Sequence, residues 1–239
     1  MKKFAVFDID GTLIRWQLYH SLADRLAHHG YINEASYETM REARMQWKRR
    51  TSDEAFPLYE RRVVQAFDSA LKSISPQQLD EVVNEVFAEY KDQAYTYSRN
   101  LIAKLKNEDY FLLAISGSPV EIVSKVAQYY GFDDWRGSTH FSKDGRFTGA
   151  KRVVSYHKDK TLIEMIKKHD LSYAVSIGVG DTRSDIAILE MVASPIAFNP
   201  DRYLYEYARM RAWDIVLERK NMVYELKYQD GKYQLAQAG

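Results

Sequence analysis

Three apolar runs along the chain each end in a polar, glycine-containing loop. They are KKFAVFDIDG at 2–11, YFLLAISGS at 110–118 and YAVSIGVGD at 173–181. None alternates strictly between apolar and polar positions, which is typical of strands buried on both faces of a parallel sheet. Helical patterns follow the second and third runs, over 119–130 and 184–192. The order of elements therefore predicts strands that alternate with helices.

A fourth apolar run, SPIAFN at 194–199, precedes a further helix start. Asn199 is the expected N-cap of that helix and Pro200 its first residue. Alternating strands and helices with right-handed crossovers build a doubly wound sheet. We therefore predict an α/β protein with a Rossmann-like core of three layers, α/β/α.

The region from about residue 17 to residue 93 carries little strand signal and several helix starts. These starts are, in chain order, Asn33, the pair Thr51 and Glu54, and Ser75-Pro76 with Gln78. We predict four helices that form an all-helical cap over 16–97, inserted into a discontinuous core of 1–15 and 98–239. Such an insertion can act as a lid over a site. The alternative is a purely structural element or an oligomer interface.

Two patches read as β-hairpins. FSKDGRFTG places Asp144-Gly145 at its turn, and VYELKYQDGKYQLA places Asp230-Gly231 at the same point. An Asp-Gly pair between strand-like runs is a strong hairpin signal, because both turn positions need a positive φ.

The composition of the chain limits the kinds of partner and chemistry that we expect. The 239 residues include 34 Lys and Arg and 33 Asp and Glu, so no overall charge draws the chain to nucleic acid or to a membrane surface. There is no cysteine, which excludes disulfides and thiolate chemistry. No apolar run approaches the roughly 20 residues that span a bilayer, and MKKF is not followed by a signal-like segment. We expect a cytoplasmic protein.

Two acids, Asp8 and Asp10, end the first apolar run and are followed by Gly11 and Thr12. In open α/β sheets, ligands bind at the carboxyl ends of the strands. Buried carboxylates need a compensating cation, and carboxylate and carbonyl oxygens suit Mg²⁺. The alternative is a strand that simply ends in an Asp-Gly turn.

The order of four short motifs decides between these interpretations. Asp8-Ile9-Asp10-Gly11-Thr12 resembles the DxDGT motif of the haloacid dehalogenase (HAD) superfamily. Ser116 matches its second motif, Lys160 its third, and Gly180-Asp181 with Asp185 its fourth, GDxxxD. Lys151 and Lys158 lie near Lys160 in the sequence. The resemblance spans about residues 4–200, and the helical insertion resembles a type 1 cap.

The resemblance implies a phosphatase mechanism. Asp8 is the expected nucleophile, forming an aspartyl-phosphate, and Asp10 is the expected general acid and base. Lys160 would offset charge, and Asp8, Asp10 (through its carbonyl) and Asp181 would hold Mg²⁺. Asp185 would support the metal's waters or the lysine. The residues expected to bind phosphate are Gly11, Thr12, Ser116 and Gly117.

The strings DGRFTG and SPIAFNPD resemble the phosphoserine phosphatase-like branch, subfamily IB. The chain departs from true phosphoserine phosphatases at three positions: Gln17 replaces a glutamate that contacts the substrate's amino group, Gly11 a serine and Ser184 an asparagine. An amide lacks the charge that complements an ammonium. Gln17 remains a candidate substrate contact, but these departures argue against L-phosphoserine itself.

We therefore predict a Mg²⁺-dependent phosphatase that acts on a small phosphorylated metabolite. Two alternatives remain: a phosphotransferase that passes the phosphoryl group to an alcohol, and a non-catalytic binding protein on the same scaffold. The full set of motif residues argues against the binding protein. The sequence does not reveal the substrate, the cap residues that select it, or the oligomeric state.

Overall fold

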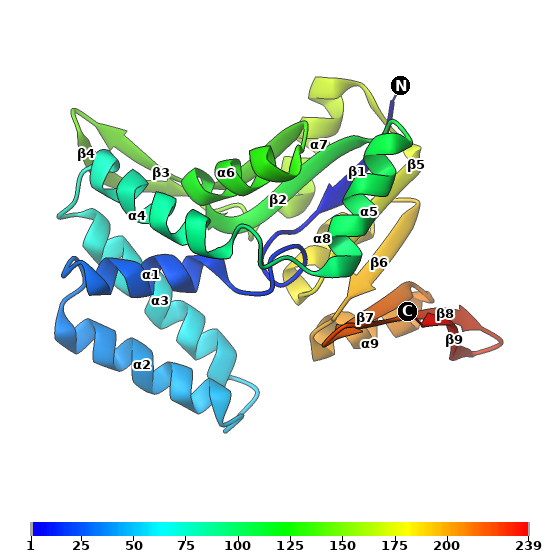
Figure 1. Cartoon of the computed structure of the whole chain (residues 1–239), viewed down its shortest axis with the longest axis horizontal. Coiled ribbons are helices and arrows are strands. Elements are labelled where there is room, and N and C mark those ends of the chain that lie inside the picture. The colour runs from blue at the N-terminus through cyan, green and yellow to red at the C-terminus, as the bar shows by residue number, and fades with distance from the viewer. Residues whose placement is uncertain (1, 239) are drawn as a thin grey trace. The chain divides into compact units, whose positions relative to one another are not determined.

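A computed structural model describes residues 2–238 (Figure 1). The helices are α1 (Leu18–His28), α2 (Glu34–Lys48), α3 (Ala55–Leu71), α4 (Pro76–Tyr90), α5 (Thr96–Asn107), α6 (Val120–Tyr130), α7 (Lys158–His169), α8 (Ile186–Leu189) and α9 (Arg202–Arg211). The strands are β1 (Lys2–Phe7), β2 (Phe111–Pro119), β3 (Asp134–Lys143), β4 (Arg146–Arg152), β5 (Leu171–Gly180), β6 (Ser194–Phe198), β7 (Asp214–Arg219), β8 (Met222–Gln229) and β9 (Lys232–Ala238).

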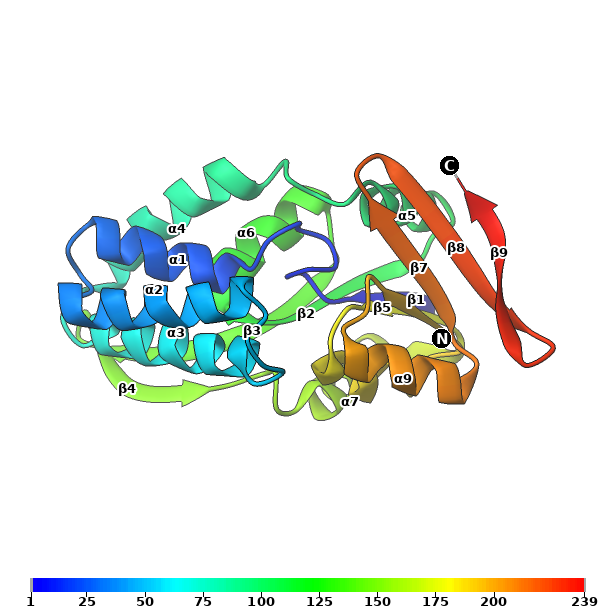
Figure 2. The same cartoon turned by 90° about the horizontal axis from the view of Figure 1, so that it is seen from below.

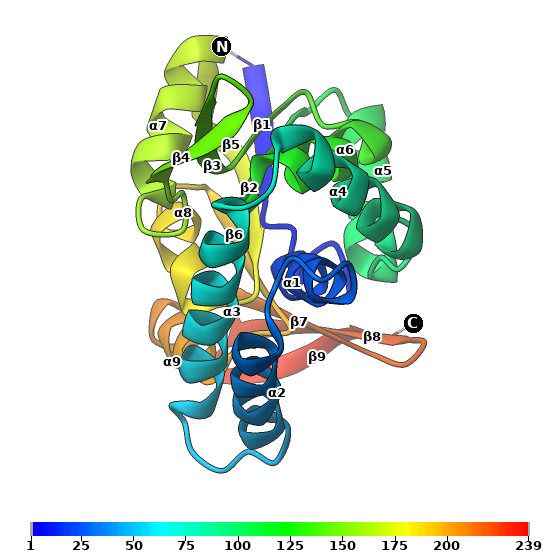
Figure 3. The same ribbon diagram turned by 90° about the vertical axis from the view of Figure 1, so that its left-hand side faces the viewer.

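The strands form one sheet in the order β4-β3-β2-β1-β5-β6-β7-β8-β9. The pairs from β3 to β7 are parallel, and the pairs β3–β4, β7–β8 and β8–β9 are antiparallel. Figure 3 shows α5 and α6 on one face of the sheet and α7, α8 and α9 on the other. The predicted α/β core with three layers is confirmed.

The central strand β1 is apolar from Phe4 to Phe7 because both of its faces are covered there. Phe4, Ala5, Val6 and Phe7 are all 0% exposed. Phe4 and Val6 join a core with residues of β2, α7 and β6. Burial on both faces explains why the run lacks strict alternation.

The chain divides into two compact units. The first comprises residues 1–16, 90–138 and 153–239, and the second comprises 17–89 and 139–152. The second unit holds the four helices α1–α4 and, beyond the predicted 16–97, the residues around the Asp144-Gly145 turn. That hairpin forms as expected, with Lys143 paired to Arg146. The role of this unit as a cap stays a prediction.

The capping signals had mixed outcomes. The Asn33 side chain accepts a hydrogen bond from Ser36 N at 2.9 Å, and Ser75 and Gln78 form the predicted reciprocal capping box. The predicted box of Thr51 and Glu54 is wrong, because the Thr51 hydroxyl donates to Gln46 O instead.

The expected Asn199 cap is also wrong. Asp201 caps α9 through Leu204 N at 2.7 Å. Asn199 has a φ of 41°, and its side chain accepts from Glu218 N at 2.8 Å. The side-chain oxygen of Asn199, which the sequence assigned to the helix N-cap, is therefore bonded to strand β7 instead.

The second predicted hairpin, β8–β9, turns at Asp230-Gly231, with Gln229 paired to Lys232. Within residues 2–238, no helix combines the length and the apolar character needed to cross a lipid bilayer.

Candidate active site

Asp8 lies directly after β1 in a buried cluster of charges. It is 5% exposed, and Lys158 Nζ donates to its Oδ1 at 2.6 Å. The same ammonium donates to Asp185 Oδ1 at 2.6 Å, and Lys158 and Asp185 are 2% and 0% exposed. One lysine thus bridges two buried carboxylates, which gives each of them a partner that buried charges require.

Burial raises the pKa of Asp8 to about 8, and Lys158 opposes that rise while Asp185 and Asp10 add to it. The pKa of Asp181 is also raised, first by burial and then by Asp8 and Asp185. Burial alone would lower the pKa of Lys158, but Asp185 and Asp8 hold it above its ordinary value. The single ammonium does not balance three acids, so the cluster favours a further cation.

The lysine at this position is Lys158 and not the predicted Lys160. Lys158 is the first residue of α7 and lies on its buried face, whereas Lys160 is exposed. Two residues along a helix correspond to a rotation of about 200°, so the two side chains leave opposite faces. The sequence carried a signal for this: Lys158 shares a face with Leu162, Met165 and Ile166.

Asp10 follows the end of β1, and Ser116 lies within β2; their side chains are in contact. The Ser116 hydroxyl donates to Asp10 Oδ2 at 2.7 Å and accepts from Ser118 N at 2.9 Å. Ser116 is 0% exposed and Asp10 is 9% exposed. The structure therefore brings together Asp10 of the first motif and Ser116 of the second, which lie far apart in the sequence.

Gly11 is required where it stands. Its φ is +82°, and a Cβ added there would lie 2.1 Å from Asp181 Oδ2. Any other side chain would collide with this acid and strain the backbone. Thr12 donates from its hydroxyl to Asp181 Oδ1 at 3.0 Å, so both residues position Asp181.

The N–H groups of Gly11 and Thr12 have backbone acceptors within the turn after β1. The Gly11 N–H donates to Ile14 O at 2.9 Å, and the Thr12 N–H donates to Ile9 O at 3.3 Å. The tight turn after β1 uses these donors for its own backbone. The phosphate-binding roles of Gly11, Thr12, Ser116 and Gly117 stay predictions.

Asp185 organises the loop that follows β5. Its Oδ2 accepts from Asp181 N at 3.1 Å and Thr182 N at 2.9 Å, and Thr182 completes a capping box with it. Gly180 lacks a side chain because a Cβ there would lie 2.4 Å from Asp185 Cβ. The predicted supporting role of Asp185 thus has a geometric basis, since it orders both Lys158 and Asp181.

Three carboxylates, from Asp8, Asp181 and Asp185, have oxygens within 4.8 Å of one another. Hard oxygen donors at this spacing fit Mg²⁺ and exclude the sulfur and imidazole sets that favour zinc. Asp185 is already satisfied by Lys158 and two N–H groups, so Asp8 and Asp181 are the better donors. The residues present therefore fit the expected metal.

Gln17 lies outside the first unit, as the residue before α1. It makes no side-chain cap to that helix and is half-buried. Its predicted contact with a substrate stays a prediction.

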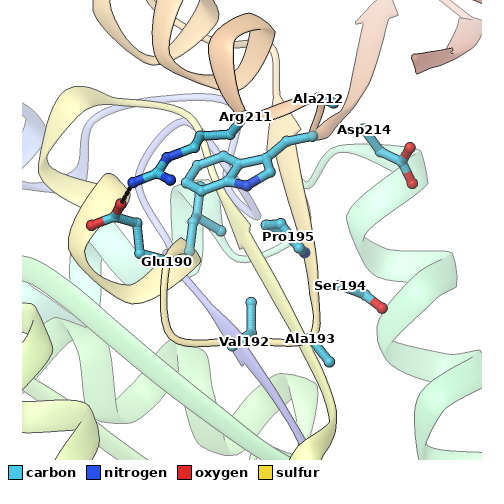
Figure 4. A pocket seen from close by; sticks show the side chains of 10 residues that line it. Glu190, Val192, Ala193, Ser194, Pro195, Arg211, Ala212 and Asp214 are labelled. Carbon is cyan, nitrogen blue, oxygen red and sulfur yellow. Dashed lines mark hydrogen bonds and ion pairs between the residues drawn. The ribbon is translucent and has the colours of Figure 1, made fainter. Parts of the chain in front are cut away.

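A cavity of about 510 Å³ lies elsewhere in the first unit (Figure 4). Its lining includes Ser194 and Asp214, the first residues of β6 and β7, so it opens at the amino ends of these strands. Arg211 and Glu190 form an ion pair at its rim, 2.8 Å apart. The acids follow the carboxyl ends of β1 and β5, and this cavity is therefore separate from them.

Comparison with known proteins agrees with this geometry. A family model described as haloacid dehalogenase-like hydrolase matches residues 5–190. A histidinol-phosphatase of Neisseria meningitidis serogroup C (strain 8013) is 25% identical over 226 residues, covering 90% of this chain and 99% of that protein. A phosphoserine phosphatase of Archaeoglobus fulgidus is 23% identical, covering 93% of this chain and 58% of that protein.

Solved structures share the fold. A protein of unknown function from Bordetella pertussis Tohama I superimposes with a TM-score of 0.72 at 20% identity, covering 90% of this chain and 98% of that one. A structure described as the phospho-aspartyl intermediate analogue of phosphoserine phosphatase gives 0.62 at 21% identity, covering 92% and 95%. The chain belongs to the haloacid dehalogenase-like hydrolase family, and it shares the fold of structures described as phosphoserine phosphatases.

Proposed function

We propose that this protein is a Mg²⁺-dependent phosphatase that hydrolyses a small phosphomonoester through an aspartyl-phosphate on Asp8. The observation that carries the proposal is the position of Lys158, buried and 2.6 Å from both Asp8 and Asp185. An ammonium held there lowers the pKa of Asp8 and so favours its nucleophilic carboxylate form, but burial still holds that pKa at about 8, so positive charge from bound Mg²⁺ would also be needed at neutral pH.

In the first step, an Asp8 oxygen attacks phosphorus and the bond to the leaving alcohol oxygen breaks in line. Asp10 delivers a proton to that oxygen, for which it must be protonated when Asp8 is not. In the second step, Asp10 takes a proton from water as the water attacks phosphorus, and Asp8 is released. Bound Mg²⁺, held by Asp8 and Asp181, would supply positive charge to the phosphoryl oxygens.

The Ser116 hydroxyl has one role before the phosphoryl group binds and another after it. It now donates to Asp10 Oδ2 at 2.7 Å, which orients the carboxyl group. A bound phosphoryl group would offer it a stronger acceptor, since charged oxygens form the stronger hydrogen bonds. Moving that hydrogen bond to phosphate would free Asp10 for proton transfer.

We propose that the second unit selects the substrate as a cap. The names of the relatives suggest histidinol phosphate and phosphoserine as members of the substrate class to test. Gln17 in place of a glutamate disfavours phosphoserine.

The deciding experiment measures phosphate release from a panel of phosphorylated metabolites, with Mg²⁺ and with EDTA, for the wild type and for Asp8→Asn. We expect the wild type to release phosphate with Mg²⁺ and not with EDTA. We also expect labelled phosphate from the substrate to become bound to the wild-type protein and not to Asp8→Asn. Equal release by both proteins from every substrate would refute the proposal. Adding alcohols as acceptors separates hydrolysis from phosphotransfer, because a phosphotransferase would yield new phosphate esters in place of free phosphate. A wild type that binds a phosphorylated ligand without turnover would support the binding-protein alternative.

A further inference from the structure

The side chain of Ser138, in β3, connects two segments of the first unit that carry site residues. Its hydroxyl donates to Gly117 O at 2.7 Å and accepts from Val154 N at 3.3 Å, and Ser138 is 4% exposed. Gly117 lies in β2, the neighbour of β3 in the sheet (Figure 2), and Val154 lies between β4 and α7. The two segments come close here, since a Cβ added at Gly117 would lie 3.2 Å from Ser155 Cβ. One buried hydroxyl therefore holds both backbones.

The pairing of β2 with β3 is irregular around Gly117. Two pairs flank the irregular stretch, Ile115 with Arg136 and Pro119 with Ser138. Between these pairs β2 advances four residues and β3 advances two. Extra residues in one strand interrupt the ladder of backbone hydrogen bonds locally. The Ser138 side chain thus supplies this stretch of β2 with a bond in place of the regular ladder.

The same stretch of β2 carries the hydroxyl that contacts the expected general acid. Ser116 donates to Asp10 Oδ2 at 2.7 Å and accepts from Ser118 N at 2.9 Å. The Ser118 N–H and the Gly117 carbonyl belong to one peptide group, which is planar. Ser138 holds the oxygen of this group, so it also fixes the direction of the N–H that bonds to Ser116.

The second segment leads to the lysine of the acid cluster. Val154 is 3% exposed, its N–H donates to Ser138, and its carbonyl accepts from His157 N at 2.9 Å. Lys158 follows as the first residue of α7, and its Nζ donates to Asp8 Oδ1 at 2.6 Å. The bond from Ser138 therefore fixes the backbone from which this helix and its lysine start.

We propose that Ser138 is a positioning residue for the phosphatase reaction, because it holds the backbones that carry Ser116 and Lys158 at a fixed separation. Ser116 contacts Asp10, and Lys158 contacts Asp8. One hydroxyl thus aligns the expected general acid with the expected nucleophile, and a displacement of about 1 Å in such an alignment costs on the order of 100-fold in rate. The inference rests on the proposed function.

Ser176 provides a matched control, since it has the same local chemistry away from the acids. It is 1% exposed, and its hydroxyl donates to Tyr173 O at 2.7 Å and accepts from Ala193 N at 2.9 Å. It pairs with Phe4, and Asp8 lies four residues further along the chain, roughly 13 Å away in an extended strand. A purely structural role predicts equal consequences for the two serines.

The test measures kcat and KM of the wild type, Ser138→Ala and Ser176→Ala with p-nitrophenyl phosphate and Mg²⁺. Each variant loses a buried hydroxyl with two hydrogen bonds, so we expect similar falls in the urea midpoint. Ser138→Ala should lower kcat by at least about tenfold and change KM by less than about threefold, as expected when transition-state alignment is lost. Ser176→Ala should keep both within about twofold of the wild type. Ser138→Cys keeps the volume with a weak donor and should show the same fall in kcat if Ser138→Ala does not fold.

A double-mutant cycle with Ser116→Ala separates positioning from general loss of stability. If Ser138 acts through Ser116, the two substitutions together should lower kcat by less than the product of their single effects. The effects of Ser116→Ala and Ser176→Ala should multiply. Equal losses of kcat in Ser138→Ala and Ser176→Ala, or multiplied effects of Ser116→Ala and Ser138→Ala, would overturn the proposal.

Hydrogen exchange followed by NMR provides a readout that needs no turnover. In Ser138→Ala the N–H groups of Ser118 and Val154 should exchange at least about tenfold faster than in Ser176→Ala, because their segments lose a common anchor. A wild type that hydrolyses no phosphate ester refutes the proposed function. In that case faster exchange at both groups still supports the anchoring by Ser138, and unchanged exchange overturns it.

Discussion

Lys158 illustrates how the position of a residue on a helix decides whether its side chain reaches the acid cluster. The motif order pointed to a lysine near the start of α7, and two lysines two residues apart satisfied it. The apolar face formed by Leu162, Met165 and Ile166 selects Lys158, because that face packs into the core. To identify a site residue on a helix, its position on the buried face is thus a stronger signal than its distance from a motif.

We predict that Lys158→Met lowers phosphatase activity by about 100-fold or more, because it removes the charge beside the nucleophile. It should also lower the free energy of unfolding by about 3 kcal/mol, since Asp8 and Asp185 lose their buried partner. Lys160→Met is the matched control and should change stability by less than about 0.5 kcal/mol. Steady-state kinetics and urea unfolding measure both. Loss of activity in Lys160→Met alone would contradict the assignment.

His20 is a buried histidine in the second unit that the sequence did not single out. It is 2% exposed, and its ring lies 4.4 Å from that of Tyr59. Burial, together with Arg44, lowers its pKa to about 3. The neutral ring therefore contributes stability that is fully present above its unfolded pKa of about 6.5 and is lost as pH falls towards 3.

We predict that His20→Phe flattens the acid side of the stability curve. Between pH 6 and pH 4 the wild type should lose up to about 1.4 kcal/mol per pH unit from this group, and the variant should lose less. Urea unfolding at several pH values measures the slope. His28→Phe, at an exposed histidine of the same helix, should keep the wild-type slope. Parallel curves for His20→Phe and the wild type would count against the prediction.

At the scale of elements, Glu218 of β7 joins three segments of the first unit. Its carboxylate accepts from Thr96 N at 3.1 Å and from Tyr97 N at 2.8 Å, at the start of α5. It also accepts from Arg15 Nη2 at 2.6 Å, and Arg15 Nε donates to Ala94 O at 3.0 Å. One buried acid therefore fixes the beginning of a helix and the segment that leaves the turn after β1.

We predict that Glu218→Ala lowers the free energy of unfolding by about 3 kcal/mol, because Arg15 and two N–H groups lose their acceptor. Glu218→Gln should lose less, since its carbonyl oxygen still accepts. Glu108→Ala, at an exposed residue 3.9 Å from Lys104, is the control, with an expected change below about 1 kcal/mol. Urea unfolding compares the three variants, and equal losses in Glu218→Ala and Glu108→Ala would refute the anchoring role.

Two helix start signals show the difference between a local hydrogen bond and competition from a distant strand. Ser75 and Gln78 bond to each other, and the sequence showed both. Asn199 has the right residue type and spacing for a cap, but Glu218 N in β7 takes its side chain. No local pattern announces a partner 19 residues away.

At the scale of the whole molecule, the layer architecture followed from the sequence because buried parallel strands and amphipathic helices leave separate patterns. The membership of residues 139–152 in the second unit did not follow, since their hairpin contains the second half of β3, and the first half of the same strand pairs with β2 in the first unit. The grouping of Asp8, Asp181 and Asp185 at one site was likewise predictable from motif order. The contact of Asp10 with Ser116 was not, because it depends on how β1 and β2 align.

We predict that Mg²⁺ raises the melting temperature, because it binds the folded acid cluster and not the unfolded chain. At a concentration about 100 times its Kd, the gain should be near 2.7 kcal/mol. Asp181→Asn should abolish most of this response, and Asp144→Asn, at the exposed hairpin turn, should retain it. Calorimetry with and without Mg²⁺ measures the shift. An equal response in Asp181→Asn would exclude Asp181 as a ligand.

The central place of β1 has a consequence for synthesis on the ribosome. The first strand to be made lies between β2, at Phe111–Pro119, and β5, at Leu171–Gly180. One of its edges therefore waits until about three quarters of the chain has been translated, and Lys158 reaches Asp8 only late in that interval. During that time β1, which Asp8 follows directly, has one edge without its partner strand, so we expect the nascent chain to expose that edge and the acid cluster to stay incomplete until β5 has been made.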